Sequence, residues 1–114
     1  MADIGYVREK MSGAVRTMAR GEGGLRPRLF DAYLAFHTLG QSDFPTDEMR
    51  RDFDWIMEAL TEHKEPDTVA QAARQGHVQY TLGQVSDARC SEIAERIIAL
   101  ESKVSYWEPE RADD

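Results

Sequence analysis

Apolar residues recur every three or four positions in the first part of the chain. The stripe consists of Ile4, Val7, Met11, Val15 and Met18. This spacing places the apolar side chains on one face of an amphipathic helix. We therefore predict a first helix over residues 4–18. We expect it to end at the segment RGEGG (20–24), because neighbouring glycines disfavour helical geometry.

The clearest helical pattern lies in the last part of the chain, after Ser86 and Asp87, which suit a helix N-terminus. Its apolar positions again step by three or four residues and are Cys90, Ile93, Ile97, Leu100, Val104 and Trp107. We predict a long last helix here. Residues 108–114 should form a frayed acidic tail.

A second helix is expected from about Pro27 to Leu39, since proline suits the first helical turn. One of its faces carries Leu25, Leu29, Ala32, Tyr33 and Phe36. A second apolar arc on the same helix carries Phe30, Leu34 and His37. A helix that is apolar on two sides either lies centrally in the fold or is covered in an oligomer, and we favour the central position.

A third helix should begin after Thr46, a plausible N-cap, with Asp47 and Glu48 at the positive end of the helix dipole. It should end before Pro66, because proline disfavours helical geometry at the preceding residue. Trp55 lies off its apolar face, which consists of Met49, Phe53, Ile56, Leu60 and His63.

The segment over residues 67–85 is less regular. Asp67 can cap a short fourth helix up to Gln75, with Gly76 as its C-terminal stop. Residues 77–85 fit both a strand and a helical face, and we predict a short helix because no second strand is available for pairing.

These patterns predict an all-α fold, a compact bundle of four to five helices with a short helix-turn-helix-like connector near residues 67–85. A chain of 114 residues suits a single domain, which we place over residues 1–107. The predicted core consists of Met11, Val15, Leu29, Phe36, Phe53, Ile56, Leu60, Ile93, Ile97 and Leu100.

The helix-turn-helix pattern raises the question of DNA binding. In the candidate reading helix, Gln79, Thr81 and Gln84 could contact bases. However, Arg74 is the only cation between Thr68 and Val85, and phosphate contacts come mainly from Lys and Arg. We therefore do not expect nucleic acid as a partner.

Charge is distributed unevenly along the chain, whose net charge is −7. Residues 1–30 carry six Lys/Arg and three Asp/Glu, a net +3, whereas residues 31–114 carry eight and eighteen, a net −10. This asymmetry bears on partners rather than on the fold. We expect the basic first part to complement the acidic remainder, either within the fold or between protomers.

Known catalytic and metal-binding patterns are missing from the sequence. One cysteine and three histidines, scattered over separate segments, do not form a zinc motif, and the glycines of residues 21–24 do not form a phosphate-binding loop. Cys90 lies on an apolar stripe, where cysteine usually behaves as a small hydrophobe. We therefore expect no enzyme activity, no cofactor and no metal. Without an apolar run long enough for a membrane span or a secretory signal, we expect a cytoplasmic location and no membrane partner.

Our leading hypothesis is a non-catalytic regulatory or adaptor protein, prokaryotic or phage-encoded, that acts by binding another protein. Aromatic and arginine side chains outside the core are common anchors of interfaces. Self-association as a homodimer or higher oligomer is also expected, from the last helix and the two-faced second helix. The candidate interaction residues are Tyr6, Arg16, Arg20, Asp54, Trp55, Glu58, Glu62, Gln79, Tyr80, Gln84, Tyr106 and Trp107.

The second hypothesis is an acidic inhibitor that occupies the nucleic-acid-binding groove of an enzyme, as anti-CRISPR and other anti-defence proteins do. It depends on acidic rows that could mimic phosphates or dock a basic partner. These rows are Asp47, Asp54, Glu58 and Glu62 on the third helix and Glu92 and Glu95 on the last helix. A DNA-binding regulator is the third and weakest hypothesis.

Overall fold

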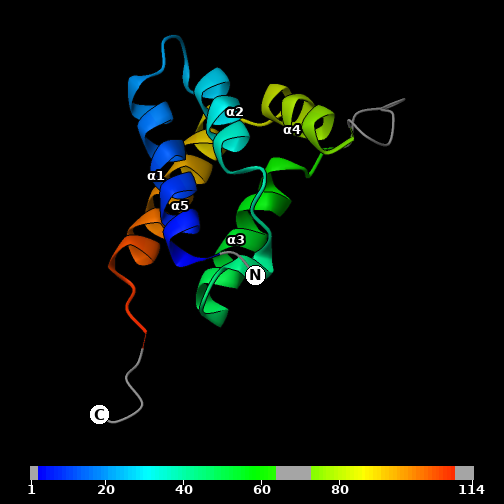
Figure 1. Cartoon of the computed structure of the whole chain (residues 1–114). Helices are drawn as coiled ribbons and strands as arrows, with labels where there is room; N and C mark the ends of the chain where they lie inside the picture. The colour runs from blue at the N-terminus through cyan, green and yellow to red at the C-terminus, as the bar shows by residue number, and fades with distance from the viewer. Residues whose placement is uncertain (1–2, 64–72, 110–114) are drawn as a thin grey trace.

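A computed structural model describes residues 3–63 and 73–109 of the chain (Figure 1). The described part contains helices and no strand, so the predicted all-α bundle is confirmed. Its elements are α1 (Ile4–Arg20), α2 (Leu25–Phe36), a short 3₁₀ helix η1 (Gln41–Asp43), α3 (Asp47–Leu60), α4 (Ala73–Gln84) and α5 (Asp87–Tyr106).

The helices pack around α5, which contacts α1, α2 and α3. The hairpin of α1 and α2 lies along one side of α5, and α3 lies along another. Helix α4 crosses the end of the bundle and rests on α2 and α3 (Figure 1). The α1–α5 pair and α4 therefore lie on different sides of the molecule.

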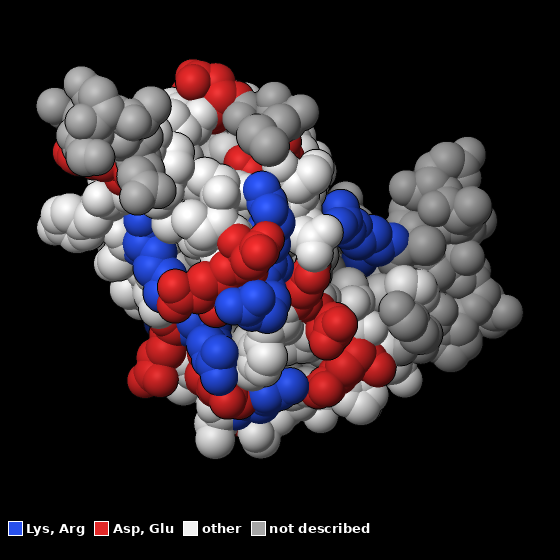
Figure 2. Space-filling view, turned by 90° about the horizontal axis from the view of Figure 1, so that it is seen from below, with Lys and Arg blue, Asp and Glu red and all other residues white. Residues whose placement is uncertain are grey.

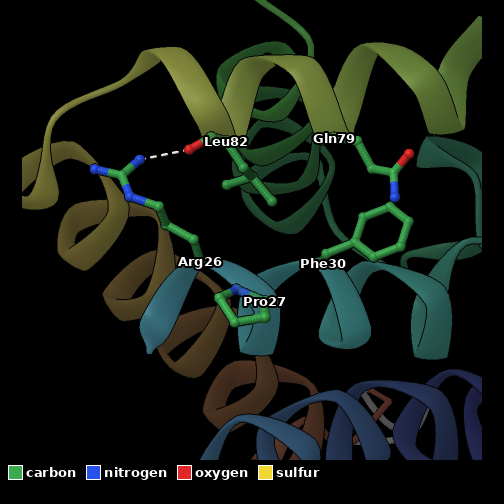
Figure 3. A pocket seen from close by; sticks show the side chains of 5 residues that line it. All are labelled: Arg26, Pro27, Phe30, Gln79 and Leu82. Carbon is green, nitrogen blue, oxygen red and sulfur yellow. Dashed lines mark hydrogen bonds between the residues drawn. The ribbon is translucent and has the colours of Figure 1, made fainter. Parts of the chain in front are cut away.

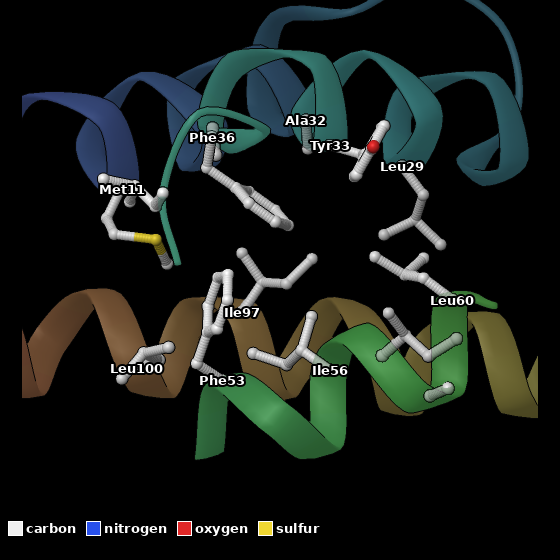
Figure 4. Packing of buried hydrophobic residues seen from close by; sticks show 14 of the residues in the cluster. Met11, Leu29, Ala32, Tyr33, Phe36, Phe53, Ile56, Leu60, Ile97 and Leu100 are labelled. Carbon is white, nitrogen blue, oxygen red and sulfur yellow. The ribbon is translucent and has the colours of Figure 1, made fainter. Parts of the chain in front are cut away.

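The core is largely apolar and joins the five α-helices of the described residues. Figure 4 shows side chains from α2 meeting those of α3 and α5, with the rings of Phe36 and Phe53 6.0 Å apart in an edge-to-face arrangement. Phe44, just after η1, adds a third ring whose centroid lies 4.9 Å from that of Phe53. Of the ten predicted core residues, nine are buried, and Val15 is partly buried beside them.

Several helix bounds differ from the sequence prediction. Helix α1 continues to Arg20, and α5 ends at Tyr106, so that Trp107 takes extended backbone geometry. Helix α2 begins two residues before Pro27 and ends at Phe36 instead of Leu39. Its start keeps Pro27 within the first turn, where the missing N–H has no helical partner.

The largest correction concerns Gly76. Helix α4 runs without interruption from Ala73 to Gln84, so Gly76 lies inside a helix and does not end one. A glycine costs a helix interior only about 1 kcal/mol, which tertiary packing can offset. That packing comes from Val78 and Leu82, both buried. The predicted start of this helix at Asp67 lies outside the described residues.

Thr81 ties α4 to the end of α3. Its hydroxyl donates to the carbonyl oxygen of His63 at 3.0 Å and accepts from the N–H of His63, also at 3.0 Å. Thr81 is fully buried, and a buried hydroxyl without partners would be costly. The reciprocal pair of bonds therefore satisfies Thr81 and fixes the position of α4.

Three arginines from the basic first part of the chain bind carbonyl oxygens in the last turns of helices. Arg8 donates to Val104 of α5 at 3.1 Å, and Arg28 donates to Met18 of α1 at 2.8 Å. Arg26 donates to the carbonyl oxygen of Leu82 in α4. Last-turn carbonyls lack helical partners and carry partial negative charge, so cations stabilise them. Part of the N-terminal positive charge is therefore used within the fold.

Candidate functional site

An open apolar hollow with polar groups at its edge lies between α2 and α4. We call it the α2–α4 groove and define it by Arg26, Pro27 and Phe30 of α2 and Gln79 and Leu82 of α4. Its volume is about 290 Å³. Figure 3 shows Leu82 pointing down from α4 and Gln79 reaching toward the ring of Phe30. An apolar hollow with a few polar groups at its edge is the usual form of a binding pocket.

Arg26 closes one end of this groove and holds three helices together. Besides its bond to the carbonyl oxygen of Leu82, its Nη2 donates to Asp87 Oδ1 at 2.7 Å, at the first residue of α5. The carboxylate of Asp87 is almost fully exposed, so the pair is screened by solvent. The Arg26 guanidinium is thus fixed in position. It shapes the groove more than it raises the free energy of unfolding.

A second hollow of about 350 Å³ lies on the other side of Arg26. Cys90 lines it together with Asp87 and Ser91, but only 1% of Cys90 is exposed. Burial raises the pKa of the Cys90 thiol, and the nearby charge of Arg26 offsets this only in part. Because the thiolate is the nucleophilic form, these surroundings suit a core residue better than a catalytic one.

The histidines take part in local contacts. The Nδ1 of His37 lies 2.7 Å from the carbonyl oxygen of Leu34, and the Nε2 of His63 lies 3.9 Å from a carboxylate oxygen of Glu62. Over residues 3–63 and 73–109, no three His, Cys, Asp or Glu side chains converge as they would around a metal ion. The structure therefore offers no candidate metal centre in these ranges.

The five predicted aromatic interaction residues, Tyr6, Trp55, Tyr80, Tyr106 and Trp107, differ in exposure. Tyr106 is 87% exposed. Tyr6 is more than one-third exposed, and its hydroxyl is hydrogen-bonded to Thr38 at 2.8 Å. Trp107 is partly buried against the core.

Trp55 is the aromatic residue whose surroundings differ most from the sequence expectation. It lies off the main apolar face of α3, but its indole packs against α5, with the guanidinium carbons of Arg89 and Arg96 at 4.9 and 4.3 Å from the ring centroid. Cations over an aromatic face are attracted by the ring quadrupole. The indole is therefore part of the α3–α5 contact instead of a free anchor.

The predicted acidic row on α3 is divided among different contacts. Asp54 accepts a bond from Gln41 at 2.7 Å, and Glu62, which follows the end of the helix, lies 3.6 Å from Arg89. Glu58 is exposed. On the face seen in Figure 2, basic and acidic side chains alternate, and no broad area of one sign appears there.

Two cations of α1 stand apart from these networks. Arg16 and Arg20 are both exposed, and neither forms an ion pair with any residue in the described ranges. Arg26, on the same part of the chain, is ion-paired with Asp87, and Arg8 and Arg28 donate to backbone carbonyl oxygens.

Of the three residues predicted on α4, the structure brings only Gln79 into the groove. Tyr80 and Gln84 are exposed on the same helix. Sequence reasoning missed Arg26 and Leu82 as groove residues, because a groove between helices depends on how they cross. The second apolar arc of α2 did provide a signal, since Phe30 belongs to it and forms part of the groove.

Comparisons with protein families, curated proteins and solved structures find no match for this chain. None of the helices in the described residues is both long and apolar enough to cross a membrane.

Proposed function

We propose that this protein acts by binding another protein and that the α2–α4 groove receives an apolar side chain of that partner. The observation that carries the proposal is the pairing of a half-buried aromatic ring, Phe30, with the buried side chain of Leu82 in one open hollow. Anchor side chains in such hollows contribute most of the energy at many interfaces.

The edge of the groove adds polar selectivity. The Gln79 amide is exposed and carries both donors and an acceptor, so it can bond the backbone of an incoming segment. The Arg26 guanidinium is held by Leu82 and Asp87, which reduces the entropy lost when a partner orders that edge. A segment with one apolar anchor between polar neighbours fits this arrangement.

A non-catalytic role is part of the proposal. Its support is the state of the residues that chemistry would need: the Cys90 thiol is buried with a raised pKa, and the ring of His37 is bonded to the backbone. The acidic-inhibitor alternative receives less support, because Glu62 and Glu92 both lie against Arg89.

The test is site-specific photo-cross-linking. A benzophenone side chain is placed at Gln79 in the groove or at Glu58 on the exposed face of α3, which reports on the acidic-row alternative. A protein captured in the native host is then purified and mixed with both derivatives. We expect the purified protein to cross-link at position 79 and not at position 58. Equal cross-linking at both positions, or cross-linking at position 58 alone, would contradict the proposal.

A further inference from the structure

The outer face of the α1–α5 pair combines an apolar hollow with charges of opposite sign on its two helices. We propose that this face binds a second copy of the same chain, with α1 of each protomer lying over α5 of the other. The inference goes beyond the proposed function, since it concerns a surface on a different side of the molecule from α4.

The apolar component is centred on Ile98. This side chain is 46% exposed, the most exposed aliphatic residue among the described large hydrophobics. It lines a hollow of about 210 Å³ at the junction of α1, α5 and the start of α2, together with Val15, Met18, Ala19, Leu25, Arg28 and Ala94. Several exposed residues of α5 near Ile98 are small, namely Ser91, Ala99 and Ser102, and Glu95 adds a charge beside them. Small side chains allow the backbones of two helices to approach closely, and Ile98 can then enter the hollow of a second copy.

The charged component follows from the antiparallel register of the two helices. Arg8 is hydrogen-bonded to Val104, and Ser12 is hydrogen-bonded to Glu101. Residues with higher numbers on α1 therefore lie beside residues with lower numbers on α5. Ala19 and Ala94 then meet in the hollow. Their next neighbours, Arg20 and Glu95, lie at the same level, and both are exposed.

Within one chain Arg20 and Glu95 form no ion pair with each other or with another residue in the described part of the molecule. A two-fold axis that runs along the α1–α5 groove brings Arg20 over Glu95 of the partner subunit. The same symmetry repeats this contact, so one interface gains two ion pairs. Arg16, which is one turn before Arg20, adds positive charge on the same side. Rotation about an axis across the helices would instead oppose α1 to α1 and bring like charges together.

Sedimentation velocity over a concentration series of about 1 μM to 1 mM tests the proposal, a range that brackets weak dimers. We expect the mass to rise from the 13.0 kDa of one chain toward twice that value. Ile98→Ser should weaken dimerisation at least tenfold. The matched change Leu34→Ser, at an exposed leucine of α2, should leave it unchanged.

Charge reversal makes the test specific to this arrangement. Arg20→Glu and Glu95→Arg should each weaken the dimer, whereas the double variant should restore it, because opposite charges again face each other. A monomer at every concentration would overturn the proposal. It would also be overturned if Ile98→Ser left dimerisation unchanged, or if the double variant dimerised more weakly than both single variants. Cross-linking at position 79 is measured separately, so failure of either proposal is distinguishable from failure of the other.

Discussion

Arg8 on the second turn of α1 donates its Nε to the carbonyl oxygen of Val104, 96 residues later in the chain, at 3.1 Å. The same guanidinium also donates to the carbonyl oxygen of Trp107. The two ends of the described chain are thus joined by a charged donor on carbonyls that have no helical partner.

We predict that Arg8→Met destabilises the fold by about 1–2 kcal/mol, because bonds from a charged donor are lost while the aliphatic length is kept. Urea unfolding followed by circular dichroism measures this. The control is Arg51→Met at an exposed arginine of α3, which makes no hydrogen bond within the described residues and should change stability by less than about 0.5 kcal/mol. Equal effects of the two substitutions would show that Arg8 does not cap α5.

Thr81 is expected to control how α4 sits on the bundle. Thr81→Val keeps the shape of the side chain but leaves both the N–H and the carbonyl of His63 without their partner. We predict a loss of about 1–3 kcal/mol in unfolding free energy. Thr38→Val, at an exposed threonine, is the matched control. An unchanged stability for Thr81→Val would mean that the apolar contacts of α4 alone hold it in place.

Lys103 joins α5 to α3 and should make stability depend on pH at both ends of the range. Its Nζ donates to Asp52 at 2.7 Å and to Glu48 at 2.8 Å. The bond from Lys103 lowers the pKa of Glu48, and the bonds to Asp52 and then Glu48 raise the pKa of Lys103.

The signs follow from linkage. The ionised Glu48 carboxylate stabilises the folded state at pH values above its ordinary pKa of about 4.3. This stabilisation is lost as the pH falls through the lowered pKa of Glu48 in the folded protein. The charged Lys103 ammonium stabilises the folded state at pH values below the ordinary lysine pKa of about 10.4. This stabilisation is lost as the pH rises through the raised pKa of Lys103 in the folded protein. The difference in urea midpoint between wild type and Lys103→Met should therefore be widest near neutral pH and narrow in acid and in strong alkali. A difference that is constant with pH would refute this assignment.

The helices were predictable where local pattern and burial agree. The stripe of α5 from Cys90 to Val104 is buried as expected, and Thr46 caps α3 by accepting a bond from Met49. The sequence predicts a helix end at Gly76 because glycine has a low intrinsic helix propensity. The burial of Val78 and Leu82, which the local pattern does not reveal, offsets that propensity. The sequence predicts self-association from the stripe of α5 and from the two-faced second helix, but the α5 stripe is buried inside the protomer. The sequence pattern does not single out the outer face of α5.

The groove was predictable only in part. The sequence indicates Gln79 as an exposed amide and places Phe30 on a second apolar arc of α2, and both residues line the groove. The role of Arg26 could not be read from the sequence, because its partners Leu82 and Asp87 are 56 and 61 residues away and meet it only through the crossing of α4 over α2. Long-range contacts of this kind depend on tertiary geometry, which composition and periodicity do not specify.

The most direct test of the account is the affinity of the captured partner for two matched variants of α4. Gln79→Arg places a long cation in the α2–α4 groove, whereas Gln84→Arg makes the same change at an exposed position outside it. Isothermal titration of the purified proteins should show at least a tenfold weaker Kd for Gln79→Arg and an unchanged Kd for Gln84→Arg. Equal affinities for the two variants would contradict the assignment of the groove as the binding site.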